Sequence, residues 1–108
     1  MKRRVFFLTH LRPGVDPADY ERFLVDYDYP RSKELLPVSE YKATRIEGRA
    51  VSDGETPYAY IEVLDIDDFE TYKAAFADPS PEVAELIEKV FSYVDDKSAL
   101  DLQGEVIE

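Results

Sequence analysis

The chain has 108 residues, a formal net charge of -11 from 24 acidic and 13 basic residues, and no cysteine. This length suits one domain that buries about two-thirds of its unfolded surface, and the absence of cysteine excludes disulfides and thiolate metal sites. Nucleic acid and anionic membranes are expected not to be partners, because binding to either depends on clustered positive charge.

Residues 4–11 form an almost uninterrupted apolar and aromatic run of strand length, and the Arg-Pro-Gly sequence at 12–14 ends it. A strand with one solvated face alternates apolar and polar residues, and this run does not, so we expect both faces to be covered. Helices are expected over the face of His10. A second copy of the chain is expected over the face of Phe7 and Thr9.

The next segment has the start signals of a helix. Asp16 is a suitable N-cap and Pro17 suits the first helical position, where a missing N–H costs nothing. Pro30 is expected to end or kink this helix, and residues 31–36 are expected to add one or two turns.

Two further helical segments follow later in the chain. One is expected after a cap at Asp65 or Asp67, and a Pro-rich sequence at residues 78–81 interrupts it. Ser80 and Pro81 then provide a cap and a first helical residue. The stripe of apolar residues that follows is Val83, Leu86, Ile87, Val90 and Val94.

Three more strands are expected. Residues 39–51 are more polar and suit an edge strand, the turn cluster at 52–57 makes a hairpin, and residues 58–64 form the strand after it. Residues 97–107 are expected to close the sheet.

The order strand, helix, strand, strand, helix, strand predicts an α+β fold. It is the ferredoxin-like βαββαβ arrangement, one domain over residues 1–108, with a four-stranded antiparallel sheet and both helical layers on one face. The other face is expected to be apolar. We therefore expect a homodimer that buries this open sheet face and so overcomes the repulsion between two acidic chains.

The sequence leaves two kinds of function open, acid–base catalysis or binding without catalysis. The sequence has one histidine, no glycine-rich phosphate loop, no nucleophile elbow and no calcium-loop spacing of carboxylates, so no cofactor or metal is expected. His10 is the first candidate, as an acid or base near neutrality. The alternative is a histidine at a strand end that takes part in no chemistry.

Glu62 is the second candidate, because a carboxylate in an otherwise apolar central strand is costly to bury unless it is paired. It could act as a general base or hold a substrate N–H. The alternative is an ion pair across the hairpin with Arg45 or Lys42. Arg45 is also a candidate ligand contact.

Aromatic residues complete the predicted site. Residues 26–31 alternate acid and tyrosine at a helix end, so Asp26 and Tyr29 are expected at the lip of a pocket. Tyr58 and Tyr60 share a face with Glu62 and are expected to stack on a flat ligand. An aromatic cavity with a few polar groups is the usual composition of a small-molecule site.

Two stretches, residues 4–17 and 26–30, resemble the RedY-like (HapK-like) family, and length and element order are similar over the whole chain. The resemblance implies a cofactor-free homodimer of the dimeric α/β-barrel group. It also implies a pocket between sheet and helices and a role in secondary metabolism alongside pathways for prodigiosin-type pigments. Related members are regarded as cyclases in aromatic alkaloid assembly.

The leading hypothesis is an enzyme that binds an aromatic pyrrole- or indole-type intermediate and promotes its cyclisation or condensation by proton transfer. One alternative is a cofactor-free monooxygenase or isomerase of the same barrel group. Another is a non-catalytic protein that binds or carries the intermediate. The apolar run near the N-terminus is too short for a signal peptide, so a cytoplasmic location is expected.

Overall fold

The structure is a computed structural model that describes residues 2–108. Its elements, in chain order, are β1 (Arg3–Thr9), α1 (Pro17–Phe23), η1 (Leu24–Asp28), α2 (Tyr29–Leu35), β2 (Val38–Arg45), β3 (Tyr60–Ile66), α3 (Phe69–Ala77), α4 (Pro81–Phe91) and β4 (Leu100–Glu105).

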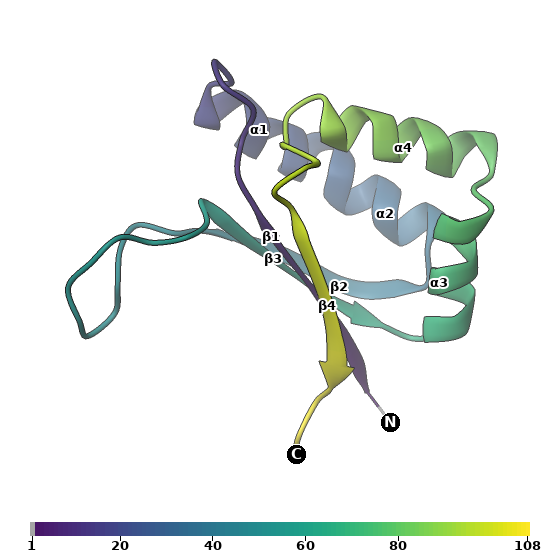
Figure 1. Cartoon of the computed structure of the whole chain (residues 1–108). Helices are drawn as coiled ribbons and strands as arrows, with labels where there is room; N and C mark the ends of the chain where they lie inside the picture. Colours follow the sequence, from purple (N-terminus) through teal and green to yellow (C-terminus); the bar gives the residue numbers. More distant parts are fainter. Residues whose placement is uncertain (1) are drawn as a thin grey trace.

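The four strands form one antiparallel sheet in the order β2-β3-β1-β4. All helices lie over one face of this sheet, and no helix or strand of residues 2–108 lies over the other face (Figure 1). This arrangement confirms the predicted ferredoxin-like α+β fold and the edge position of the second strand.

The faces of β1 are the reverse of the expectation. Val5 and Thr9 are both 4 % exposed and lie on the helical side together with Phe7. Phe6 and Leu8 lie on the open side of the sheet. Because β1 is apolar on both faces, its alternation of side chains gives no signal of which face the helices cover.

The open face is nonetheless apolar across three strands, since residues directly opposite in an antiparallel ladder share a face. Phe6 lies opposite Val63 and Leu102, and Leu8 lies opposite Ile61 and Leu100. The apolar open face, as we call this surface, therefore consists of Phe6, Leu8, Ile61, Val63, Leu100 and Leu102.

Pro30 does not end the first helical segment, which continues without a break from α1 to α2. The residues before the proline form a π-helix, η1, in which the N–H of Tyr29 donates to the carbonyl of Leu24. Proline cannot donate to the preceding turn and its ring clashes with the carbonyl four residues back. A wider turn accommodates both defects, so the chain remains helical.

The wider turn also aligns a buried stripe whose members are spaced by four residues. In a regular α-helix such a stripe rotates by about 40° at each step, and the π-turn offsets part of this rotation. As a result the polar residues Asp28 and Ser32 are buried between apolar members of the stripe. The stripe is Tyr20, Leu24, Asp28, Ser32 and Leu36.

All four strands differ in extent from the expectation, and β1 already ends at Thr9. β2 ends at Arg45, and residues 46–59 form a loop that projects from the sheet, closed at its base by the Ile46 N–H donating to Ala59 O at 2.8 Å (Figure 1). β3 begins and ends two residues later than expected, and Arg4 pairs with Asp65 at 2.7 Å, which neutralises the Asp65 charge within the strand. β4 is shorter, since its partner β1 begins at Arg3.

The cap of α3 is Asp68, not Asp65 or Asp67. Its carboxylate accepts a hydrogen bond from the Thr71 N–H at 3.1 Å. The predicted start of α4 is confirmed, with Pro81 in the first turn and the Ser80 hydroxyl oxygen accepting from the Val83 N–H at 3.2 Å.

Replacing Ser80 by alanine is expected to lower the free energy of unfolding by about 1 kcal/mol, because the Val83 N–H then has no cap. Urea denaturation measures this. The matched control is Ser52→Ala in the exposed loop, for which a change within about 0.5 kcal/mol is expected. Equal effects of the two substitutions would show that the cap contributes nothing.

Candidate functional site

A cavity of about 550 Å³ lies between the sheet and the helices. Its wall is mostly apolar and comes from β1, β3, α3 and α4, with Phe7, Leu64, Phe69, Leu86 and Val90 as examples. A few polar groups interrupt this wall, which is the usual composition of a small-molecule site.

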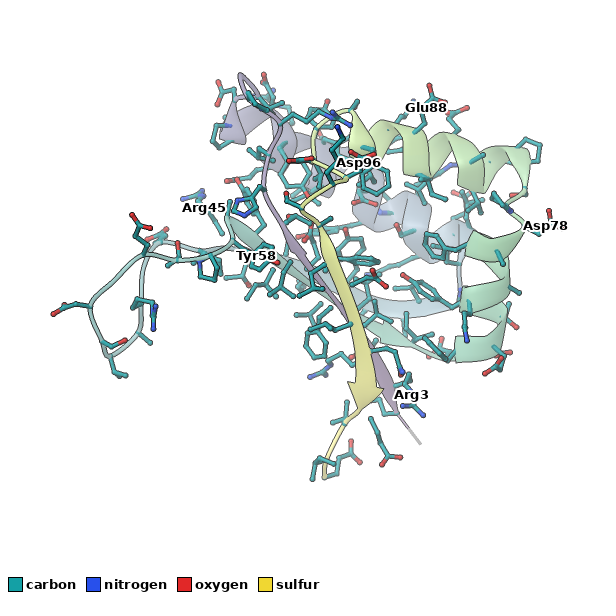
Figure 2. All side chains as sticks on the ribbon, viewed as in Figure 1. Arg3, Arg45, Tyr58, Asp78, Glu88 and Asp96 are labelled. Carbon is teal, nitrogen blue, oxygen red and sulfur yellow. The ribbon has the colours of Figure 1, made fainter. Side chains whose placement is uncertain are left out.

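The cavity opens between α3, β4 and the segment before β4. The lining residues that are exposed to solvent all come from these three segments, while the rest are buried or half-buried. They are Lys73, Phe76, Asp96, Asp101, Leu102 and Gln103. Figure 2 shows Asp96 beside the chain that leaves α4.

Glu62 is the central polar residue of the cavity. It lies in the middle of the interior strand β3 and is 3 % exposed. The Tyr20 hydroxyl donates to Glu62 Oε1, and the Thr9 hydroxyl donates to Oε2 at 3.3 Å. Burial raises the pKa of Glu62 to about 7, with a smaller contribution from the charge of Asp28, while the two hydrogen bonds act to lower it. Both protonation states are therefore populated near neutrality, as a general acid or base requires.

Asp28, at the end of η1, is a second buried carboxylate in the same cavity. Ser32 Oγ donates to Asp28 Oδ1 at 2.9 Å, and the Tyr41 hydroxyl donates to Oδ2 at 2.7 Å. Burial raises the pKa of Asp28, and these two bonds oppose the rise. Within residues 2–108, no Lys, Arg or His forms a salt bridge with Asp28 or Glu62.

Of the residues predicted from the sequence, Glu62 alone lines the cavity. His10 directly follows β1 and does not line the cavity, and its ring packs on that of Tyr58 with centroids 5.1 Å apart. Figure 2 shows Tyr58 near the end of the sheet from which the loop projects. The expectation that His10 lies at the mouth of the cleft was wrong, because the faces of β1 are reversed.

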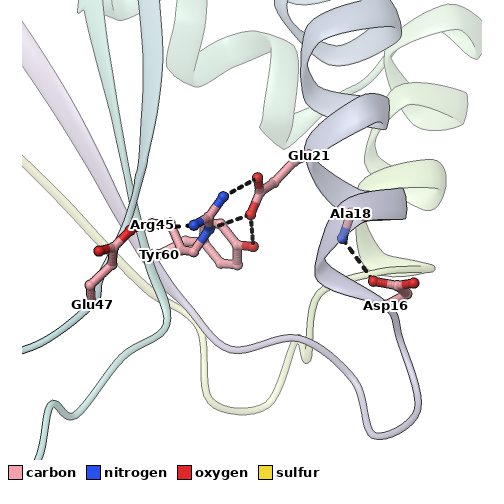
Figure 3. Close-up of polar contacts among 6 residues, drawn as sticks. All are labelled: Asp16, Ala18, Glu21, Arg45, Glu47 and Tyr60. Atoms are coloured by element: carbon pink, nitrogen blue, oxygen red, sulfur yellow. Dashed lines mark hydrogen bonds and ion pairs between the residues drawn. The ribbon is translucent and has the colours of Figure 1, made fainter.

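Arg45 and Tyr60 belong to a separate polar cluster (Figure 3). Arg45 forms two hydrogen bonds of 2.7 Å with the Glu21 carboxylate, and the Tyr60 hydroxyl donates to Glu21 Oε2 at 2.6 Å. These contacts lower the pKa of Glu21 to about 2. The predicted alternative for Glu62, an ion pair with Arg45 or Lys42, is therefore not formed.

Tyr29 and Asp26 also lie outside the cavity. The Tyr29 hydroxyl accepts a hydrogen bond from the Ala43 N–H of β2 at 2.7 Å, so it anchors α2 to the sheet edge. Asp26 is exposed and lines a small surface hollow with Phe23 and Tyr93.

Sequence reasoning missed the second half of the site, Asp28 with Ser32 and Tyr41. The signal that could have found it is the four-residue spacing from Tyr20 onward, which places Asp28 on the buried stripe. Thr9 and Tyr20 were missed as partners of Glu62 for a different reason. Their contacts join β1 and α1 to β3 and depend on which face the helices cover.

Neither a metal-binding group of side chains nor a membrane-spanning helix is found in the part of the chain that the structure describes. Residues 2–108 contain no group of three or more histidine or acidic residues placed to hold a metal ion. None of the helices in that range is long and apolar enough to span a bilayer.

The fold is shared by solved structures of low sequence identity. HapK from Hahella chejuensis is 20 % identical with a TM-score of 0.75, over 97 % of this chain and 92 % of that one. Hydroxynitrile lyase from Passiflora edulis is 16 % identical with a TM-score of 0.73, over 99 % and 93 %. A dimeric ferredoxin-like protein from Thermobifida fusca YX is 19 % identical with a TM-score of 0.63, over 98 % and 92 %.

These similarities show that the chain has the ferredoxin-like α+β fold. The family described as REDY-like protein HapK matches residues 3–103. The chain therefore belongs to the RedY-like (HapK) family, as the resemblance of its first thirty residues indicated. A comparison with curated protein sequences gives no match.

Proposed function

We propose that the protein binds a flat, nitrogen-containing aromatic intermediate of secondary metabolism and promotes its cyclisation or condensation by proton transfer. The observation that carries this proposal is Glu62, a buried carboxylate with a pKa of about 7 in a cavity with an otherwise mostly apolar wall. Glu62 takes or gives the proton and Tyr20 stabilises its ionised form. The aromatic wall, including Phe7 and Phe69, packs on the ring.

Membership of the RedY-like family supports a pyrrole- or indole-type ligand. The hydroxynitrile lyase shows that this fold also occurs in an enzyme. The chemistry proposed here uses only groups that the chain supplies, with no cofactor. A contribution of His10 as acid or base stays a prediction, which the turnover of His10→Ala tests.

A second function, binding or carriage of the intermediate without catalysis, is favoured by one observation. Both oxygens of Glu62 already accept hydrogen bonds from Tyr20 and Thr9, so the carboxylate has partners without a ligand. A carrier retains its aromatic ligand through purification and gives no turnover. An enzyme gives turnover that Glu62→Gln lowers.

We also propose that the protein is a homodimer through the apolar open face. The relative from Thermobifida fusca is described as a dimeric ferredoxin-like protein, and exposed apolar patches of this kind commonly mark interaction sites. Light scattering coupled to gel filtration measures the mass directly.

Pyrrole and indole derivatives are expected to raise the melting temperature of the protein. A ligand at about 100 times its Kd stabilises the native state by about 2.7 kcal/mol, which corresponds to a shift of roughly 10 °C or more in a domain of this size. Differential scanning fluorimetry measures the shift.

The control tests whether the ligand lies in the cavity. Val90→Trp fills the cavity and is expected to abolish the ligand-induced shift, while Val25→Trp, on an exposed part of η1, is expected to retain it. A shift that persists in Val90→Trp would place the ligand elsewhere.

A further inference from the structure

Acidic side chains outnumber basic ones among the residues that line the cavity. Four carboxylates line it, those of Asp28, Glu62, Asp96 and Asp101, and one cation, Lys73, lies at the exposed rim. The two carboxylates of the interior have hydroxyl partners and no cationic partner, as described above. A ligand that enters this cavity therefore meets a negative potential that is screened least at the buried end.

Tyr72 adds a buried hydroxyl to the cavity that has no hydrogen-bond partner in the described part of the chain. Tyr72 of α3 is 5 % exposed and lines the cavity, and its hydroxyl has no hydrogen-bond partner among residues 2–108. Burial raises the pKa of this hydroxyl, and so do the charges of Asp28 and Asp101. Buried hydroxyls are normally hydrogen-bonded, so an unpaired one in a cavity points to a ligand group that binds there.

We propose that the ligand carries a positively charged, hydrogen-bond-donating nitrogen on its aromatic framework, of the protonated amine or amidine class, which contacts Asp28 and Glu62. The inference rests on the proposed function, because it concerns the same cavity. A cation supplies the missing counter-charge, and hydrogen bonds between charged groups are about twice as strong as neutral ones. The Tyr72 hydroxyl accepts a further N–H or donates to an acceptor on the ring.

The binding of such a cation is coupled to the protonation of Glu62. Thr9 from β1 and Tyr20 from α1 donate hydrogen bonds to Glu62. Asp28 from η1, Tyr29 from α2 and Tyr41 from β2 interact with it electrostatically, and none of these five groups is a cation. At the cavity, α4 supplies apolar side chains only. A bound cation favours the ionised carboxylate, so the complex releases a proton and its affinity rises with pH through neutrality.

Three indoles of the same shape test the charge directly. They are 5-amidinoindole as the cation, indole-5-carboxamide as the neutral isostere and indole-5-carboxylate as the anion. At pH 8 we expect the amidine to bind at least about tenfold more tightly than the amide, and the carboxylate to bind more weakly than both. Calorimetry at pH 7 in two buffers of different ionisation enthalpy is expected to show release of up to about half a proton with the amidine and none with the amide.

Glu62→Gln is expected to abolish the proton release and to reduce the preference for the amidine to less than about threefold, the remainder being due to Asp28. The matched control is Glu88→Gln, the same change on the exposed surface of α4, where Figure 2 shows Glu88 pointing away from the sheet. The control is expected to bind as the wild type does. Circular dichroism verifies that each variant is folded, and the proton release of the wild type requires no variant.

The possible outcomes separate the two proposals. Equal binding of amidine and amide without proton release would overturn the charge inference and leave aromatic binding in place. Failure of all three indoles to bind the wild type would overturn the indole-type ligand of the proposed function, and the charge inference with it.

Discussion

Replacing Glu62 by glutamine is expected to abolish a loss of stability with rising pH. Between pH 4.5 and 8.5 the titration of Glu62 lowers the free energy of unfolding of the wild type by about 3 kcal/mol, and the variant lacks this decrease. The reason is the difference between the two states of the chain. Glu62 has its ordinary pKa of 4.5 in the unfolded chain and a pKa of about 7 in the native protein, where burial disfavours its charge.

The sign of the effect follows from proton binding. Between these two pKa values the native state binds more protons at Glu62 than the unfolded state does. The contribution of the protonated residue to stability is therefore fully present below pH 4.5 and is lost as the pH rises through 7. Glutamine carries no charge at any pH, so the contribution of residue 62 to the stability of the variant does not fall with rising pH.

Urea denaturation of both proteins at a series of pH values measures the effect as a difference of two curves. Other shifted carboxyls, such as Asp28 with a raised pKa and Asp65 with a lowered one, are present in both proteins and largely cancel. Glu88→Gln controls for the substitution itself. Parallel curves for the wild type and Glu62→Gln would mean that Glu62 is not titrating near neutrality.

Replacing Phe6 by glutamate is expected to convert a dimer into a monomer, with a rise of at least about 100-fold in the dimer Kd. Phe6 lies in β1 between Val63 and Leu102, at the centre of the apolar open face. A glutamate there would bury a charge without a partner when two copies associate. Sedimentation velocity over a range of protein concentrations measures the Kd.

The matched control for this substitution is Val25→Glu. Val25 is 62 % exposed on η1, on the helical side of the molecule, so the same charge is expected to leave the dimer unchanged. A wild type that is monomeric at micromolar concentration would contradict the proposed dimer. A Phe6→Glu variant that remains dimeric would place the interface on another face.

The element order could be predicted from the sequence because its signals are local. The Ser80-Pro81 start of α4 and the apolar run of β1 require no knowledge of the rest of the chain. Which face of β1 lies against the helices could not be predicted, since a strand with apolar residues on both faces can pack against them with either face. The helical face is decided by contacts such as Thr9 with Glu62, across 53 residues of sequence.

One residue of the site could be predicted from the sequence. Glu62 stood out as a carboxylate in an apolar central strand, and the structure places it in the cavity. Asp28 precedes a proline expected to end or kink the helix, so the sequence suggested a lip and not a buried position. Its burial depends on the π-turn of η1, which keeps the helix continuous through Pro30.

The most direct test of the proposed acid–base role of Glu62 is the titration of its carboxyl carbon by carbon-13 NMR of the glutamate-labelled protein. Glu62→Gln assigns the resonance by removing it. We expect an apparent pKa of about 7 that shifts downward when 5-amidinoindole is bound. A titration with the ordinary glutamate pKa of about 4.5 would contradict it, because Glu62 would then be fully ionised at neutral pH and would hold no proton to exchange.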